Sequence, residues 1–183
     1  MVYKFKRKPL SIEDQDRLVN ACQTPTEKLV VNGLLETGLR AGELANLTKQ
    51  NFRWQEGIIL LDGKGGPYGH MTKTRIIPLT RISRAIFENW FAINNKFPVG
   101  KRQIEKIVQK LAGRAGITAH CCPHVLRHTF AVRTIEKGIS TRTLMMVLGH
   151  DHLSTTEIYL NISPETVKRE FREKWDRIYG ETI

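Results

Sequence analysis

The stretch of sequence that decides the fold is His124-Val125-Leu126-Arg127-His128-Thr129-Phe130-Ala131. It belongs to a segment with helical spacing of apolar residues, which predicts a helix from about His124 to Lys137 that stops at Gly138. Arg127 follows His124 by one helical turn, so both side chains project from the same face. A histidine and an arginine at this spacing are candidate functional residues, but the spacing alone occurs often by chance.

Helices and one hairpin are predicted along the rest of the chain. Thr24-Pro25-Thr26-Glu27 has the form of a capping box with proline at the first helical position, and the helix that follows ends near Gly38. Residues 57–61 and 75–79 are rich in β-branched side chains and predict a hairpin with a long, glycine-rich basic tip. Further helices are expected over about 11–22, 41–47, 83–95, 101–113, 141–148 and 164–179, with a short turn near 155–160. The predicted fold class is mostly α with a small antiparallel β-sheet, an α+β arrangement.

The charge of the chain points to a polyanionic partner. Its 183 residues include 29 Lys and Arg against 18 Asp and Glu, which gives a net charge of +11. Basic side chains that neutralise phosphates release counterions from nucleic acid, so DNA or RNA is the natural partner. A basic protein with scattered surface lysines is the alternative. The hydrophobic fraction of 40% is sufficient for an ordinary globular core.

The cysteines and the hydropathy pattern indicate the cellular compartment. Cys22, Cys121 and Cys122 do not form an even-numbered disulfide framework, which fits a reducing compartment. No apolar run approaches the roughly 18 residues of a membrane span. The basic N-terminus, residues 1–8, lacks the apolar region of a signal peptide. We therefore expect a cytoplasmic, DNA-associated protein.

Five separated segments together carry a resemblance to a known family. In chain order they are Thr37-Gly38-Leu39-Arg40-Ala41-Gly42-Glu43-Leu44, Gly63-Lys64-Gly65, the 124–131 stretch, Leu148-Gly149-His150, and Thr155-Thr156-Glu157-Ile158-Tyr159. Their order and spacing resemble the tyrosine recombinases, which include phage integrases and chromosome-dimer resolvases. The resemblance covers nearly the whole chain after about residue 10. It implies a catalytic domain that cuts and rejoins DNA through a 3′-phosphotyrosyl intermediate.

The resemblance assigns a role to each of the central residues. Arg40 and Arg127 resemble the pair that grips the phosphate, because guanidinium groups match its oxygens and stay charged at any working pH. Tyr159 resembles the nucleophile, whose phenol needs help in losing its proton at neutral pH. His124 is expected to act as the base or to position that proton, and His150 to be a second donor to the phosphate.

The general acid has two candidates in the hairpin tip. Lys64 resembles the lysine that protonates the departing 5′ oxygen, and the glycines on either side of it permit close approach to DNA. The tip is several residues longer than is usual in the family, and Lys73 is the alternative acid. Glu43 resembles the acid that orients Arg40 or a histidine. His128, beside Arg127, is expected to face another way and to be structural.

No cofactor or metal is expected, because the arginines would replace the divalent cation that many nucleases use. The segment His120-Cys121-Cys122-His124 raises the alternative of a zinc site. Ligands this closely spaced, without a second pair elsewhere in the chain, rarely form a tetrahedral site.

The chain is expected to form one catalytic domain over residues 1–183, with a basic arm at 1–10 and a C-terminal helix and tail at 164–183. The N-terminal DNA-clamping domain of the family is expected to be absent. The apolar stripe Val167, Phe171, Trp175 and Ile178 fits docking either on the same domain or on a neighbouring protomer, and self-association on DNA is expected. A related topoisomerase activity and a non-catalytic DNA-binding module remain the alternative functions.

Overall fold

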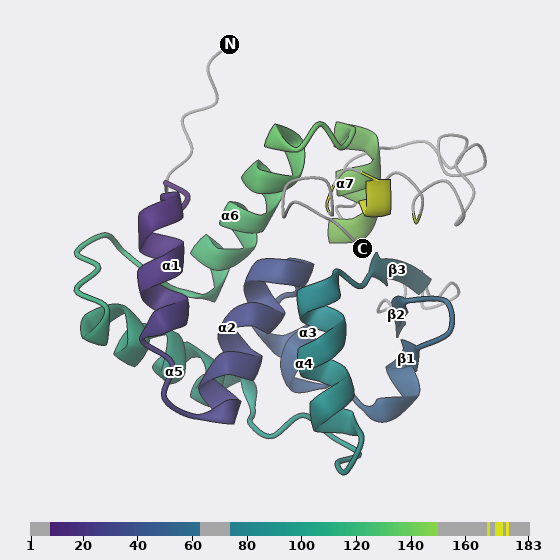
Figure 1. Ribbon diagram of the computed structural model, residues 1–183, viewed down its shortest axis with the longest axis horizontal. Coiled ribbons are helices and arrows are strands. Elements are labelled where there is room, and N and C mark those ends of the chain that lie inside the picture. The colour runs from purple at the N-terminus through teal and green to yellow at the C-terminus, as the bar shows by residue number, and fades with distance from the viewer. Residues whose placement is uncertain (1–7, 63–73, 150–167, 169–170, 174, 176–183) are drawn as a thin grey trace, which may run out of the picture.

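The computed structural model describes residues 8–62, 74–149, 168, 171–173 and 175. Within these ranges the chain is mostly helical with one small sheet, as predicted (Figure 1). The elements in chain order are α1 (Ile12–Asn20), α2 (Pro25–Thr37), α3 (Ala41–Ala45), η1 (Lys49–Asn51), β1 (Phe52–Arg53), β2 (Ile58–Asp62), β3 (Thr74–Pro78), α4 (Arg81–Phe91), α5 (Lys101–Arg114), α6 (Pro123–Glu136) and α7 (Thr141–Leu148).

Helix α2 is the centre of the domain, and its local sequence defines both ends. The Thr24 hydroxyl accepts a hydrogen bond from Glu27 N, and the Glu27 side chain accepts one from Thr24 N, which completes the predicted capping box. Gly38 ends the helix in the left-handed conformation at φ 63°. The side chains of α2 are buried around most of its circumference, and the helix contacts α1, α3, α4, α5 and α6 (Figure 1). A helix buried in this way forms the core on which the other helices assemble.

The sheet is an antiparallel meander of three strands in the order β1-β2-β3. The predicted hairpin strands pair with Leu60 opposite Ile76. Strand β1 was not predicted, because two residues are too few to show a period. It is held by Phe52, which stacks on Trp54 with ring centroids 4.4 Å apart and contacts Phe91 of α4 at 4.8 Å. Aromatic packing against α4 therefore anchors this edge of the sheet.

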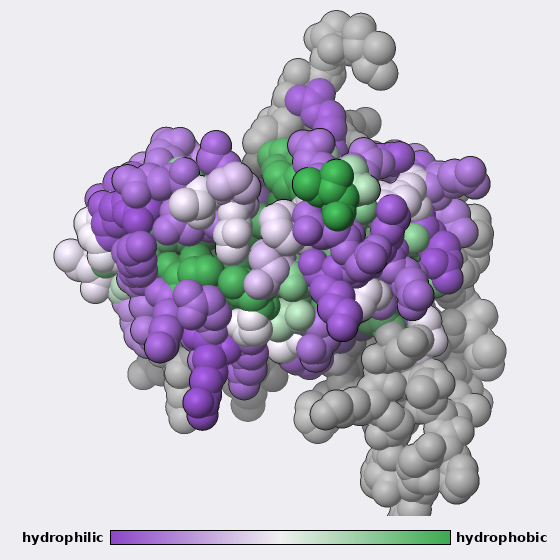
Figure 2. All heavy atoms as spheres, turned by 90° about the horizontal axis from the view of Figure 1, so that it is seen from below, coloured by the Kyte–Doolittle hydropathy of each residue, from purple (hydrophilic) through white to green (hydrophobic). Residues whose placement is uncertain are grey.

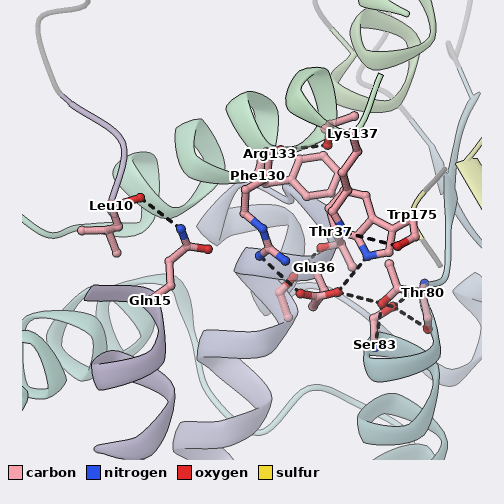
Figure 3. A network of polar contacts seen from close by, with 12 residues as sticks. Leu10, Gln15, Glu36, Thr37, Thr80, Ser83, Phe130, Arg133, Lys137 and Trp175 are labelled. Atoms are coloured by element: carbon pink, nitrogen blue, oxygen red, sulfur yellow. Dashed lines mark hydrogen bonds and ion pairs between the residues drawn. The ribbon is translucent and has the colours of Figure 1, made fainter. Parts of the chain in front are cut away.

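A buried carboxylate, that of Glu36 in α2, joins three other parts of the domain (Figure 3). Its Oε2 accepts hydrogen bonds from Thr80 Oγ1 at 2.9 Å and from Trp175 Nε1 at 3.2 Å. Its Oε1 lies 3.4 Å from Arg133 Nη1 of α6. A charge removed from water needs such partners, and Glu36 has them on both oxygens.

The described residues of the C-terminal segment pack on their own chain. Trp175 stacks on Phe171 at 4.9 Å with an interplanar angle of 9°, and both side chains are almost fully buried next to α6. Lys168 and Arg172 reach Glu56 in the turn between β1 and β2. Phe171 and Trp175 of the predicted apolar stripe thus pack on their own chain; its other two members, Val167 and Ile178, lie outside the described residues.

One face of the described molecule is largely polar. Figure 2 views the molecule from below the orientation of Figure 1 and shows mostly hydrophilic side chains around a few hydrophobic patches. Among the described residues, the large apolar side chains that are exposed are Ile12, Ile82, Ile93 and Ile135. None of the helices in this part of the chain has the length and hydropathy needed to cross a membrane.

Candidate active site

Arg40 lies at the start of α3, where one carboxylate holds both its backbone and its side chain. The extended backbone of Arg40 (φ −70°, ψ 149°) precedes the first helical residue, Ala41. Glu43, one turn later, accepts from Arg40 N at 2.8 Å through Oε2 and from Arg40 Nη1 at 2.9 Å through Oε1. The Arg40 side chain nevertheless stays 45% exposed. Its guanidinium is therefore oriented by Glu43 and still open to a ligand.

Arg127 is the buried member of the predicted arginine pair. It projects from α6 with 7% of its side chain exposed. Nη1 donates to Gly38 O at 2.6 Å and Nη2 to Leu148 O at 2.7 Å. Burial and the neighbouring Arg40 guanidinium lower the pKa of Arg127 to about 10, against the opposing effect of the Glu43 carboxylate. The side chain thus ties the end of α2 to the end of α7.

The two guanidiniums lie close to the same carboxylate and to the same helix end. Arg127 Nη1 lies 4.0 Å from Glu43 Oε2, and Glu43 also holds Arg40. Both arginines reach the end of α7, because Arg40 Nη2 lies 3.5 Å from Gly149 O and Arg127 bonds to Leu148 O. Carbonyl groups at a helix C-terminus carry partial negative charge, which favours cations at this position.

A third guanidinium, that of Arg75 in β3, belongs to the same cluster and was not predicted as a site residue. Arg75 Nη2 lies 2.6 Å from Glu43 Oε2, and 14% of the Arg75 side chain is exposed. The alternation of residues along the predicted strand already indicated that the Arg75 side chain faces inward. Alternate residues of a strand share a face, so Arg75 is in phase with Ile77, which is fully buried. A charged residue in phase with a buried one indicates an internal partner.

The electrostatics of the cluster favour an anionic ligand. Burial by itself raises the pKa of Glu43, but hydrogen bonds from Arg75 and from Arg40 N outweigh it, and the pKa falls below its ordinary value. Glu43 is therefore an ionised carboxylate at neutral pH. Three guanidiniums around this one carboxylate leave excess positive charge beside an exposed arginine side chain. Such a site can hold the oxygens of a phosphate group.

The other predicted site residues fall into two groups. His124 is exposed on the first turn of α6, one turn before Arg127. His128 is partly buried, and burial lowers its pKa, so its imidazole is neutral at pH 7. Lys64, Lys73, His150 and Tyr159 lie outside the described residues. The described chain does reach Gly149, whose carbonyl faces Arg40 and which directly precedes His150.

The alternative of a metal site gains no support from the described ranges. Within them, no three His, Cys, Asp or Glu side chains gather in a way that could hold a metal ion. Cys121, in the segment that raised the zinc alternative, is buried, and burial raises the pKa of its thiol to about 11. A protonated thiol is a poor nucleophile.

Known proteins resemble this chain in sequence. The chain is 31% identical to tyrosine recombinase XerD of Vibrio vulnificus, an alignment that covers 88% of this chain and 59% of the relative. It is 30% identical to tyrosine recombinase XerC of Lactobacillus leichmannii, with 84% and 56% covered. The chain therefore spans less than three fifths of the length of these curated relatives.

Solved structures share the fold, and residues 8–166 match the family described as Phage integrase family. The crystal structure of XerA recombinase superposes with a TM-score of 0.70 at 26% identity, covering 91% of this chain and 65% of that one. XerH recombinase bound to its difH substrate gives 0.65 at 21% identity, with 87% and 52% covered, and at that identity the likeness is one of fold. The chain therefore belongs to the phage integrase family of tyrosine recombinases.

Proposed function

We propose that this chain is a DNA strand transferase that cleaves and rejoins duplex DNA through Tyr159 in site-specific recombination. The observation that carries the proposal is the convergence of Arg40 and Arg127 around Glu43 at the end of α7. Catalysis of phosphoryl transfer depends mainly on positioned positive charge around the reacting phosphate. A half-exposed guanidinium backed by a buried one provides such charge.

In the proposed reaction the Tyr159 phenol oxygen attacks the phosphorus atom of a DNA phosphodiester. The bond between tyrosine oxygen and phosphorus forms while the bond from phosphorus to the 5′ oxygen breaks. His124 takes or positions the phenolic proton, and Lys64, or Lys73 in its place, supplies the proton that the leaving 5′ oxygen acquires. Arg40, Arg127 and His150 hold the non-bridging oxygens.

The products of this step are a 3′-phosphotyrosyl enzyme and a free 5′-hydroxyl. Attack by the 5′-hydroxyl of a second strand reverses the chemistry and releases Tyr159. The number of phosphoester bonds is unchanged, so the reaction needs no nucleotide cofactor.

Double-stranded DNA is the proposed partner, with self-association of the protein on it. The net charge of +11 supports a polyanionic partner. Related folds have been solved with DNA, among them the XerH–difH complex and Tn1549 transposon integrase with circular intermediate DNA. Excess charge at the arginine cluster would add to phosphate binding at the scissile position.

The test is capture of a covalent adduct. The protein is incubated with a pool of duplexes of random sequence, each carrying a nick, in the presence of a chelator, and adducts that survive denaturant are isolated and sequenced. A nick lets the short cleaved strand diffuse away, so the phosphotyrosyl enzyme accumulates. We expect an adduct with wild type and with Tyr179→Phe, and none with Tyr159→Phe.

Two further variants test the cation site. Arg40→Ala should slow adduct formation by about 100-fold or more, the usual loss when one charge-stabilising donor is removed. Arg53→Ala removes an exposed arginine of the same sheet and serves as the matched control. Absence of any adduct from the wild-type protein across the pool would favour a DNA-binding module without chemistry. An adduct accompanied only by relaxation of supercoils would favour a topoisomerase.

A further inference from the structure

Arg75 connects the sheet to the arginine cluster. It lies near the start of β3, opposite Leu61 of β2, and the two strands lead into and out of the segment that contains Lys64 and Lys73. Its guanidinium lies 2.6 Å from Glu43 of α3 through Nη2. One side chain thus bridges the base of the hairpin and the start of α3.

Glu43 divides its two oxygens between Arg75 and Arg40. Oε1 accepts from Arg40 Nη1 at 2.9 Å, whereas Oε2 accepts from Arg40 N at 2.8 Å and from Arg75 Nη2 at 2.6 Å. Because both oxygens are occupied, the carboxylate cannot rotate without losing a charge-assisted bond. Arg75 therefore fixes the group that orients the Arg40 guanidinium.

Arg75 also lies against Gly149 at the end of α7. A Cβ built on Gly149 would be 2.6 Å from Arg75 Nη1 and 2.9 Å from its Cδ, distances that real side chains do not reach. Gly149 has φ +63°, a conformation that already favours glycine. The same residue accepts from Arg40 Nη2 and directly precedes His150. The glycine thus permits close approach of two guanidiniums to the chain next to a predicted site residue.

We propose that Arg75 is a positioning residue for strand cleavage, which holds Glu43 and the end of α7 so that Arg40 meets the scissile phosphate in a fixed orientation. The inference rests on the proposed function. Arg75 Nη2 is already bonded to Glu43 Oε2, the carboxylate that also binds Arg40, and the Arg40 side chain beyond it is 45% exposed. Arg75 acts through Glu43 and Arg40 and does not grip the phosphate itself.

The experiment measures the single-turnover rate of adduct formation at saturating nicked duplex, and separately the dissociation constant for the same DNA. Arg75→Met keeps the apolar stem that packs on Gly149 but removes the donors, so it tests the hydrogen bonds with little risk to folding; Arg75→Ala is the second variant. We expect the rate to fall by about 10- to 100-fold, as for other residues that orient a functional group, with little change in DNA affinity. Arg75→Lys should recover part of the rate, because an ammonium can donate to Glu43 Oε2. Arg53→Ala is the matched control.

A double-mutant cycle separates positioning from direct contact with the phosphate. If Arg75 acts through Glu43, Arg75→Met should slow the reaction much less in a Glu43→Gln background than in wild type. If the rate reduction in the double variant equals the product of the two single-variant reductions to within about twofold, the two residues act independently, and the inference is overturned. An Arg75→Met variant that reacts as fast as wild type would also overturn the inference. In that case the proposed function would still stand, because the wild-type protein forms the adduct. Absence of the wild-type adduct would instead defeat the proposed function itself, and the inference with it.

Discussion

Truncation of Trp175 gives a quantitative test of how the C-terminal segment docks. The indole is 1% exposed, stacks on Phe171 and lies 5.2 Å from the ring of Phe130. Lys137 Nζ lies 4.1 Å from its centroid, and its Nε1 donates to the buried carboxylate of Glu36 (Figure 3). Trp175→Ala removes all of these contacts at once and leaves a cavity beside α6.

The expected loss of stability is about 3–5 kcal/mol, the usual cost of truncating a buried tryptophan. For a protein of this size 1 kcal/mol corresponds to roughly 2–4 °C in Tm, so Tm should fall by about 6–20 °C. Trp175→Phe keeps an aromatic ring beside Phe171 but removes the Nε1 donor to Glu36 and part of the buried ring volume. It should cost about 1.5–3 kcal/mol, as expected for a hydrogen bond to a charged acceptor.

Thermal unfolding followed by circular dichroism, at several protein concentrations, measures these shifts. Trp90→Ala is the matched control, because that indole is only partly buried and should give a smaller shift. Docking within one chain makes the wild-type Tm independent of concentration. A Tm that rises with concentration, together with a dimer in size-exclusion chromatography, would show docking on a second copy. A Trp175→Ala shift of under 2 °C would refute docking of the indole on α6 altogether.

Three further predictions concern the arginine cluster. Gly149→Ala should destabilise the protein by about 1–3 kcal/mol in a urea titration, because the backbone is left-handed and the new Cβ meets Arg75. Gly113→Ala, in the last turn of α5 where a Cβ meets nothing within 4 Å, should be neutral or stabilising in the same titration. The pKa of Glu43 is lowered below its ordinary value of 4.5, so its carboxylate adds stability above pH 4.5 that is lost as the pH falls through the folded pKa. In Glu43→Gln the free energy of unfolding should therefore fall less steeply as the pH is lowered. Identical acid-side curves for the variant and wild type would contradict the pKa shift. Sulfate at about ten times its dissociation constant should stabilise the protein by about 1.4 kcal/mol at constant ionic strength. Equal stabilisation by chloride would exclude an oxyanion site at the cluster. An unchanged sulfate effect in Arg40→Ala would exclude it as well.

Local signals in the sequence predicted the helices well. The capping box at Thr24 and Glu27 and the left-handed Gly38 define α2 through hydrogen bonds between residues at most four apart. Helix α7 was predicted over its observed bounds, Thr141–Leu148, and in the structure Ser140 caps its start while the left-handed Gly149 ends it. Strand β1 was missed, because two residues show no periodicity. The strand is defined by its pairing with β2 and its packing on α4, which are non-local contacts.

Prediction of the candidate site was partial, and the limits have a physical cause. Motif order was sufficient to name Arg40, Glu43 and Arg127, and the structure brings these three together. Arg75 was overlooked because its partner Glu43 is 32 positions away. Its strand phase marked it as facing inward but could not say what lies opposite.

The sequence by itself determined where helices begin and end, which residues carry the family resemblance, and the positive charge that favours DNA. These properties depend on near neighbours and on composition. Only the tertiary structure decided that Arg127 spans from Gly38 to Leu148, 89 and 21 positions away, and that the Glu36 carboxylate receives Trp175. Such contacts depend on how α2, α6 and α7 pack, and a periodic pattern encodes which face is buried without encoding its partner.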